Sequence, residues 1–347
     1  MFGKNLKYYR LRSHLSMKEL AERIGVSPMA ISNYESGKRM PEIQIIRKLT
    51  KALNVKLVDF MAVRDGKHTY AHCEFRKNCS LPQNEQELIR ESVEEYFDRF
   101  YVVVDALGGE VLPSFPETHC VPISDDVEET ATALRLHLGF AQTGPIINLL
   151  GNLENRGMLI YQCPLDNDSF SGMNGTVDGR PYIIINTAMT TERQRSTLVH
   201  ELAHIFCRFP DDMSEKEQEK LATAIGGAFL CPKADMLREL GLKRTRVSAD
   251  MIMVAEEYGV SMMMLSKRAE ILGIISELVY RDFMIQASQR GWRKKEPSRI
   301  SPETSVLFEQ MVIHAIGEDD ISVQRGAELL HLTWDEMNSK VQLQEAE

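Results

Sequence analysis

The chain has 347 residues, of which 43% are hydrophobic and 26% are charged. This balance is typical of a soluble globular protein of two or three domains, and it excludes a disulfide-stapled miniprotein and a disordered chain. No stretch approaches the roughly 18 apolar residues of a membrane span, and the first residues lack the apolar core of a signal peptide. The six cysteines form no C-x-x-C pair. We therefore expect reduced thiols, a cytoplasmic location and no membrane partner.

The net charge of −9 is distributed unevenly along the chain. Residues 1–60, called the head below, contain twelve Lys and Arg residues and five Asp and Glu residues, which gives them a charge of +7. The remainder of the chain therefore carries −16. Because phosphates attract cations, this asymmetry indicates that only the head contacts a polyanion.

The head has the spacing of a helix-turn-helix. Ser16 and Glu19 form the S-x-x-E pattern of a capping box, which predicts a helix that Gly25 then ends. Ser27 is placed to cap the next helix, with Pro28 at its first position. A tight turn between two short helices is the arrangement that aims the second helix into the major groove of DNA.

The segments LAERIGVS and AISNYESGKR resemble the Cro/repressor-type helix-turn-helix family over residues 4–60. The resemblance implies a double-stranded DNA operator as partner, and palindromic operators imply a homodimer. Met17 stands where the family usually has Gln, so affinity or specificity should differ. The alternative is a helix-turn-helix kept only for dimerisation or protein docking. By the resemblance, base edges would be met by Pro28, Met29, Ala30, Ser32 and Asn33, and phosphates by Lys38 and Arg39.

The rest of the chain reads as mainly helical, and we find no internal repeat. A boundary falls near residues 63–85. Within the head, Pro41 is predicted to open a further helix. Beyond it, the hydrophobic pattern predicts a long helix over 85–107, helices near 131–138 and 145–155, and strands at 158–162 and 182–186 joined by a Gly/Asp/Asn-rich connection. Helices over 190–208 and 214–230 follow, and then a mostly helical region over 247–345 that is broken near Trp292 and Pro297.

A metal-binding pattern occurs at His200-Glu201-Leu202-Ala203-His204. Residues i and i+4 lie on the same face of a helix, so both imidazoles reach one ion. Glu201 is placed to act on a water molecule at that ion. The alternative is a helix with accidental histidines.

The flanking segments RQRSTLVHELAHIF and EKLATAIGGAFLCP resemble the ImmA/IrrE family of metallopeptidases, as do PYIIIN, LEN-GMLI and GPIINLL. The resemblance covers roughly residues 70–297 and implies a zincin-like domain. We therefore predict an α+β fold, mainly α, in four parts. These are a helix-turn-helix domain (1–62), a linker with a long helix (63–120), a metallopeptidase domain (121–245) and a helical C-terminal region (246–347).

The resemblance implies that His200 and His204 bind Zn²⁺ through neutral imidazoles, with Glu219 as third ligand and a fourth position open. Glu201 would be the general base and then the general acid. Glu215 and Glu217 are rival third ligands that lack the family's spacing to the following Ala. Departures from the family are Ser196, Ala203 and Thr223, all at packing positions. Manganese and iron stay open, although two His and one Glu favour zinc.

The family chemistry also needs an electrophile that stabilises the tetrahedral intermediate. Arg193, Arg195 and Tyr182 are candidates between which the sequence does not choose. The strand at 182–186 either pairs with an extended substrate or is a buried structural strand. A second group of ligand-type residues, His68, His72, Cys73 and Cys79, matches no zinc spacing.

Three functions are consistent with these patterns. The first is a DNA-binding transcription regulator with a zinc-dependent endopeptidase domain, for which the family resemblance implies cleavage of a partner repressor or antitoxin-like protein in a stress or phage-linked response. The second is a regulator whose metal domain senses a signal or binds a partner without proteolysis. The third is an antitoxin-like protein whose acidic body masks a basic toxin.

Overall fold

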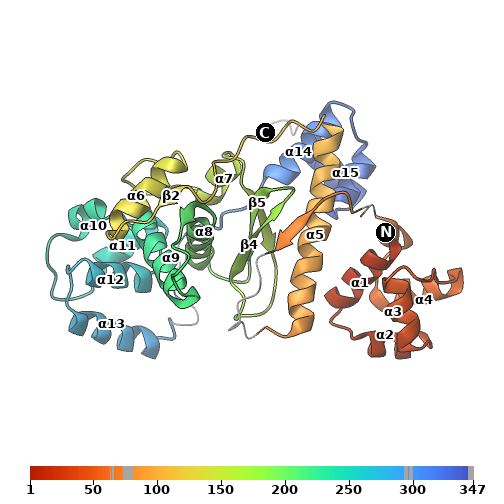
Figure 1. Ribbon diagram of the computed structural model, residues 1–347, viewed down its shortest axis with the longest axis horizontal. Helices are drawn as coiled ribbons and strands as arrows, with labels where there is room; N and C mark the ends of the chain where they lie inside the picture. Colours follow the sequence, from red (N-terminus) through yellow and green to blue (C-terminus); the bar gives the residue numbers. More distant parts are fainter. Residues whose placement is uncertain (63, 65, 73–80, 293–295, 297–299, 343–347) are drawn as a thin grey trace. The chain divides into compact units, whose positions relative to one another are not determined.

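The computed structural model describes the whole chain except residues 63, 65, 73–80, 293–295, 297–299 and 343–347. The chain folds into two compact units (Figure 1). The first comprises residues 1–112, 176–179 and 308–347, and the second comprises residues 113–175 and 180–307. The region after residue 246 is thus divided between both units.

The head forms a small helical bundle of α1 (Phe2–Arg12), α2 (Met17–Ile24), α3 (Pro28–Glu35) and α4 (Ile43–Leu53), followed by the 3₁₀ helix η1 (Leu57–Met61). The predicted capping box is present, because Ser16 accepts a hydrogen bond from the backbone of Glu19, whose carboxylate accepts one in return. Gly25 ends α2 in the left-handed region, at φ 75°, where a residue without Cβ is favoured. Ser27 caps α3 as predicted. The fourth helix begins at Ile43 rather than at Pro41.

The remainder of the first unit is organised by the long helix α5 (Gln83–Ala106), which agrees with the helix predicted at 85–107. The unit also contains β1 (Tyr70–His72), α14 (Leu307–Gly317), α15 (Val323–Leu330) and α16 (Trp334–Val341). Tyr96 and Phe100 of α5 pack against Phe308 of α14, with ring centroids 5.4 and 5.5 Å apart. Aromatic pairs of this kind attach the C-terminal helices to α5.

The second unit contains the strands β3 (Leu159–Cys163) and β5 (Arg180–Asn186) and residues 172–175 of the strand β4 (Gly172–Val177). β5 lies between β4 and β3 and pairs with β3 in parallel. β4 is a correction, because the sequence predicted only a connection there. Its two glycines hide the strand pattern, and Gly172 is required because a Cβ would lie 2.4 Å from the carbonyl oxygen of Ile184.

The helices of the second unit are α6 (Val127–His137), α7 (Leu149–Glu154), α8 (Thr191–Phe206), α9 (Glu215–Leu230), α10 (Lys233–Leu240), α11 (Asp250–Tyr258), α12 (Met262–Ile271) and α13 (Glu277–Gln289). Two short strands, β2 (Val121–Pro122) and β6 (Cys207–Arg208), pair in parallel. The helix predicted at 145–155 is shorter than expected. It begins at Leu149 because Asn148 adopts a left-handed backbone and caps it. Trp292 follows the end of α13 as predicted, whereas Pro297 lies outside the described residues.

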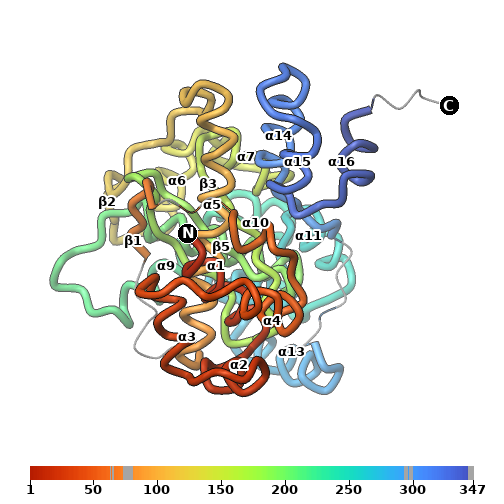
Figure 2. Tube along the Cα trace, turned by 90° about the vertical axis from the view of Figure 1, so that its right-hand side faces the viewer, coloured from red at the N-terminus to blue at the C-terminus, as the bar shows by residue number. Residues whose placement is uncertain are grey.

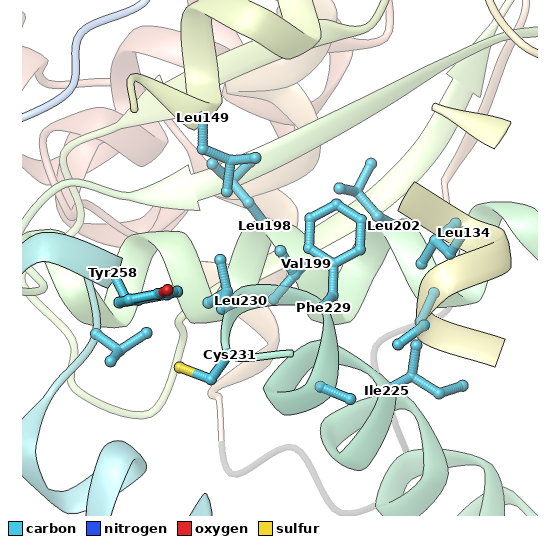
Figure 3. Packing of buried hydrophobic residues seen from close by; sticks show 14 of the residues in the cluster. Leu134, Leu149, Leu198, Val199, Leu202, Ile225, Phe229, Leu230, Cys231 and Tyr258 are labelled. Carbon is cyan, nitrogen blue, oxygen red and sulfur yellow. The ribbon is translucent and has the colours of Figure 1, made fainter. Parts of the chain in front are cut away.

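The core of the second unit lies between α8 and α9. Leu198, Val199 and Leu202 of α8 gather with Ile225 and Phe229 of α9 in one buried cluster (Figure 3). Burial of this apolar surface fixes the two helices against each other. The polar residues between these positions are thereby held on a defined face of each helix.

The prediction of an α+β fold, mainly α, with an N-terminal helix-turn-helix is confirmed. Among the described residues, no helix combines the length and the apolar character needed to cross a membrane. The cysteines at 120, 163, 207 and 231 are free thiols. Burial raises the pKa of Cys207 and Cys231 to about 12, so these two thiols stay protonated at neutral pH.

Candidate metal centre and DNA-binding face

Helix α8 presents both histidines of the H-E-x-x-H pattern on one face. Thr190 caps the helix by accepting a hydrogen bond from the backbone of Arg193. One helical turn separates His200 from His204, and their Nε2 atoms lie 3.2 Å apart. Both imidazoles are only partly exposed. The side chains are therefore directed at one common point.

Glu219 of α9 completes the group. One carboxylate oxygen lies 3.3 Å from Nε2 of His200, and the other lies 3.2 Å from Nε2 of His204. The three ligand atoms all lie within 4.8 Å of one another, and this is the single convergent group of at least three ligand-type side chains among the described residues. Two imidazole nitrogens and one carboxylate oxygen are a donor set that suits zinc, which in catalytic sites takes water as its fourth ligand.

The rival glutamates have other positions. Glu217 closes the capping box of α9, where its carboxylate accepts hydrogen bonds from the backbone and hydroxyl of Ser214. These hydrogen bonds lower the pKa of Glu217. Glu215 is the exposed first residue of α9. Neither residue joins the convergent group.

Thr223 of α9 contacts the ring nitrogen of His200 that faces away from Glu219. Its hydroxyl donates to the backbone oxygen of Glu219 at 2.9 Å and lies 3.3 Å from Nδ1 of His200. Because the hydroxyl proton is used in the first bond, the oxygen is left to accept a proton from Nδ1. That arrangement keeps the lone pair of Nε2 directed at the site. From the sequence, Thr223 was interpreted only as a packing position at which the chain departs from the family, so this contact was missed.

Glu201 follows His200 directly in α8, and its side chain is held in place. The residue is 5% exposed, and its Oε2 accepts a hydrogen bond of 2.7 Å from Nδ2 of Asn174. Asn174 belongs to β4, the strand that the sequence analysis missed. The Asp178-Gly179 turn after β4, with φ values of 50° and 79°, is the hairpin signal that could have revealed the strand.

The proposed electrophiles are mostly engaged elsewhere. Arg195 is buried, and it donates to the backbone oxygens of Gly259 and Ile146 and forms an ion pair with Glu303. Tyr182 is fully buried in β5. β5 has a neighbouring strand on each side, so it is a structural strand and not an edge open to substrate. Arg193 is exposed in the first turn of α8, almost two turns before His200.

The second group of ligand-type residues has structural contacts in the described part of the chain. His68 lies 2.6 Å from the carboxylate of Asp178 and stacks on Tyr101. His72 lies 3.6 Å from the carboxylate of Glu94. Cys73 and Cys79 fall outside the described residues. The described residues therefore give no support to a second metal site here.

Helix α3 presents the residues that were predicted to meet DNA. Met29 is 68% exposed, and Pro28, Lys38 and Arg39 are also exposed, while Ala30, Ser32 and Asn33 are partly exposed. The buried residues of α3 are Ile31 and Tyr34. A buried bidentate ion pair, with distances of 2.5 and 2.9 Å, joins Arg10 of α1 to Glu35 at the end of α3. This pair fixes the orientation of the exposed helix.

Eight of the twelve basic residues of the head fall into two sets. Lys4 and Lys7 of α1 lie 3.7 and 3.1 Å from Glu94 and Glu91 of α5. A second set, on and after α2, α3 and α4, is exposed at the surface: Lys18, Arg23, Lys38, Arg39, Arg47 and Lys51. The second set supplies the positive charge that a nucleic acid would meet.

These features define a class of protein, namely a DNA-binding regulator with a helix-turn-helix head and a domain of the metallopeptidase type. Family comparison agrees with this assignment. Residues 6–60 match the family described as "Helix-turn-helix", and residues 153–270 match the "IrrE N-terminal-like domain". The chain therefore belongs to the helix-turn-helix transcriptional regulators and carries an IrrE-like domain.

Two curated relatives match short segments of this chain. An uncharacterized HTH-type transcriptional regulator of Methanocaldococcus jannaschii is 37% identical over 60 residues, which are 17% of this chain and 91% of the relative. The multiprotein-bridging factor 1 of Candida albicans is 40% identical over 55 residues, which are 16% of this chain and 36% of the relative. The chain thus spans about a third of that factor's length. No solved structure matches the chain.

Proposed function

We propose that this regulator is a zinc-dependent endopeptidase that hydrolyses a protein partner. The observation that carries the proposal is the convergence of His200, His204 and Glu219, together with the buried Glu201 that follows His200 in α8. The three ligands come from two helices whose packing is fixed by an apolar core, so the donor set is preorganised. Membership of the IrrE-like family, which is typically metal-dependent, supports the same conclusion.

In this proposal His200, His204 and Glu219 hold the ion, and Thr223 orients the imidazole of His200. Zinc in such a site supplies Lewis acidity, which makes hydroxide available near neutral pH. Glu201 accepts the proton of the attacking water at its carboxylate and returns it to the leaving amine nitrogen. Asn174 holds that carboxylate through the 2.7 Å hydrogen bond, so the same group is positioned for both transfers.

The head would bring this chemistry to DNA. We assign base contacts to the residues that α3 exposes, and phosphate contacts to Lys38 and Arg39. A homodimer would match a palindromic operator. A protein held at an operator meets other proteins bound nearby at a high effective concentration. A repressor or antitoxin-like protein is therefore the substrate class that we propose.

The proposal is tested first by metal content. The full chain and its His204→Ala variant are purified without added metal and examined by elemental analysis. We expect about one zinc ion per chain in the native protein and a large loss in the variant. Absence of bound metal in both proteins would overturn the proposal.

A second experiment separates catalysis from sensing. Partner proteins captured with the native chain are incubated with the zinc-loaded protein and followed by mass spectrometry for new termini. New termini that a chelator prevents would support an endopeptidase. A zinc-loaded protein that binds its partner without cleaving it would instead establish a sensor or binding domain.

A further inference from the structure

The last helices of the chain repeat the geometry of the head. Ser322 caps α15, an eight-residue helix that ends at His331 in the left-handed region, with φ 56° and ψ 35°. Thr333 then caps α16, which also has eight residues. Figure 2 shows α15 and α16 as the last two helices before the C-terminus. In the head, Ser16 caps the eight-residue helix α2, which ends at Gly25 with φ 75° and ψ 45°.

The two arrangements agree position by position. The left-handed residue lies nine positions after the cap in both, and the next cap follows two positions later in both. The turn is closed by equivalent backbone hydrogen bonds, from Val26 to Ala21 at 3.0 Å and from Leu332 to Ala327 at 2.9 Å. Two short helices joined in this way are a helix-turn-helix.

The packing agrees as well. Ala21 and Ala327 occupy equivalent positions in the first helix of each pair, and both are buried. Ile31 and Met337 are equivalent in the second helix and are fully buried. A small residue on the first helix and a larger apolar residue on the second let the two helices approach each other closely. The C-terminal pair is therefore a second helix-turn-helix, which the sequence analysis did not detect as a repeat.

The C-terminal helices α14, α15 and α16 carry a charge opposite to that of the head. Residues 307–342 contain two cations, Arg325 and Lys340, against seven acids, which gives a charge of −5. The acids are Glu309, Glu318, Asp319, Asp320, Glu328, Asp335 and Glu336. A surface of this charge repels phosphates. The C-terminal pair therefore has the backbone geometry of a DNA-binding helix-turn-helix without its positive charge.

The first residues of α16 are exposed, and they differ in chemistry from the equivalent residues of α3. Trp334, which is 50% exposed, and the exposed Asp335 and Glu336 occupy the positions that Pro28, Met29 and Ala30 hold in the head. An aromatic side chain beside two carboxylates is suited to a basic protein surface, because the ring supplies contact area and the acids supply attraction.

We infer that the acidic face of α16, formed by Trp334, Asp335 and Glu336, binds the basic helix-turn-helix face of a second copy of this chain. The head carries +7 and residues 307–342 carry −5, so the two surfaces attract each other. A second copy of the chain supplies the head at the same concentration as the acidic face. Two such contacts related by a two-fold axis close a dimer. DNA phosphates compete with the carboxylates for the same cations, so DNA binding would release the contact. The inference rests on the proposed DNA-binding face and not on the metal centre.

The test uses the full chain and an Asp335→Lys/Glu336→Gln variant. Gln at 336 keeps the capping box in which residue 336 accepts from the backbone of Thr333. The matched control is Asp211→Lys/Asp212→Asn, which makes the same change of charge at exposed positions of the other unit. A Trp334→Ala variant removes the aromatic contact without changing charge.

Sedimentation velocity is measured at about 50 mM and about 500 mM salt, where charges are screened weakly and strongly. We expect a dimer for the native and control proteins at low salt, monomers for all at high salt, and monomers for both α16 variants at low salt. Affinity for a random-sequence duplex should rise about 3- to 10-fold more in the Asp335 variant than in the control.

Three results would overturn the inference. If both α16 variants still form a dimer, the two copies use another surface and the α16 contact is contradicted. The proposed operator-binding homodimer would be unaffected by that result. A native chain that is monomeric at low salt has no such contact, and the metal experiments above would be unaffected. A rise in DNA affinity without any change in sedimentation would likewise contradict the contact between copies.

Discussion

The head and the candidate metal centre are both built on two consecutive helices, yet they use the helices in opposite ways. In the head, α2 and α3 bury a common core and leave the proposed contact residues exposed, so the working surface faces outwards. In the metal centre, α8 and α9 direct His200, His204 and Glu219 at one another over distances of 3.2–3.3 Å.

The difference lies in how much each site depends on single atoms. The head attracts DNA through a distributed positive charge, to which each cation contributes a small and similar part. The metal centre depends on a few groups that are held by second contacts, such as Asn174 on Glu201 and Thr223 on His200. Substitutions should therefore weaken the head gradually and disable the metal centre abruptly.

The largest expected effect is that of Glu201→Gln on cleavage. The amide keeps the shape of the side chain but cannot accept a proton, so hydrolysis of the partner should fall by about 10²- to 10⁴-fold. Zinc content should stay near the native value, because Glu201 is not in the ligand group. Cleavage is measured by the appearance of new termini, and metal by elemental analysis.

The matched control for this prediction lies in the head. Asn33→Ala should leave cleavage of a free partner unchanged and weaken operator binding, whereas Glu201→Gln should do the reverse. Equal losses of cleavage in both variants would show that the two regions do not work separately.

The next effect concerns Thr223. Replacement by Val keeps the shape of the side chain but removes the oxygen that faces Nδ1 of His200, so zinc affinity should fall by about 10- to 100-fold. Thr223→Ser keeps the hydroxyl and should bind zinc as the native chain does. Both are measured by competition with a fluorescent zinc chelator. If Val and Ser variants bind zinc equally, the hydroxyl has no part in orienting the imidazole.

A smaller effect is expected from the phosphate contacts of the head. Lys38→Ala/Arg39→Ala should reduce the slope of log affinity against log salt by about 2, which corresponds to two lost phosphate contacts. Lys4→Ala/Lys7→Ala removes the same charge from side chains that pair with α5, and it should change the slope much less. Fluorescence anisotropy with a labelled duplex measures both. Similar slopes for the two variants would mean that long-range charge alone attracts DNA.

The same comparison explains what the sequence could predict. The head was predicted closely because its signals are local. The capping box at Ser16, the left-handed Gly25 and the cap at Ser27 each depend on residues within a few positions of one another. The two histidines were predicted for the same reason, since one helical turn joins them.

The rest of the site depends on contacts that spacing does not encode. Glu219 was assigned only through family resemblance, because the distance between two helices is set by core packing. Asn174 was missed because the glycines of β4 obscure its alternating pattern. The second helix-turn-helix was missed because only its backbone geometry, and hardly its residues, repeats that of the head.

The smallest expected effect compares the two regions directly, through their matching capping boxes. Ser16→Ala removes the cap of α2, and Ser214→Ala removes that of α9, the helix that carries Glu219. Each loss should destabilise its helix end by about 1 kcal/mol. Hydrogen exchange of the first-turn amides should therefore quicken about fivefold in the helix that is changed. Ser16→Ala should then weaken DNA binding without affecting zinc, and Ser214→Ala should weaken zinc binding without affecting DNA. A crossed effect in either variant would show that the two regions share one cooperative unit, because separate units cannot transmit the loss of a single cap.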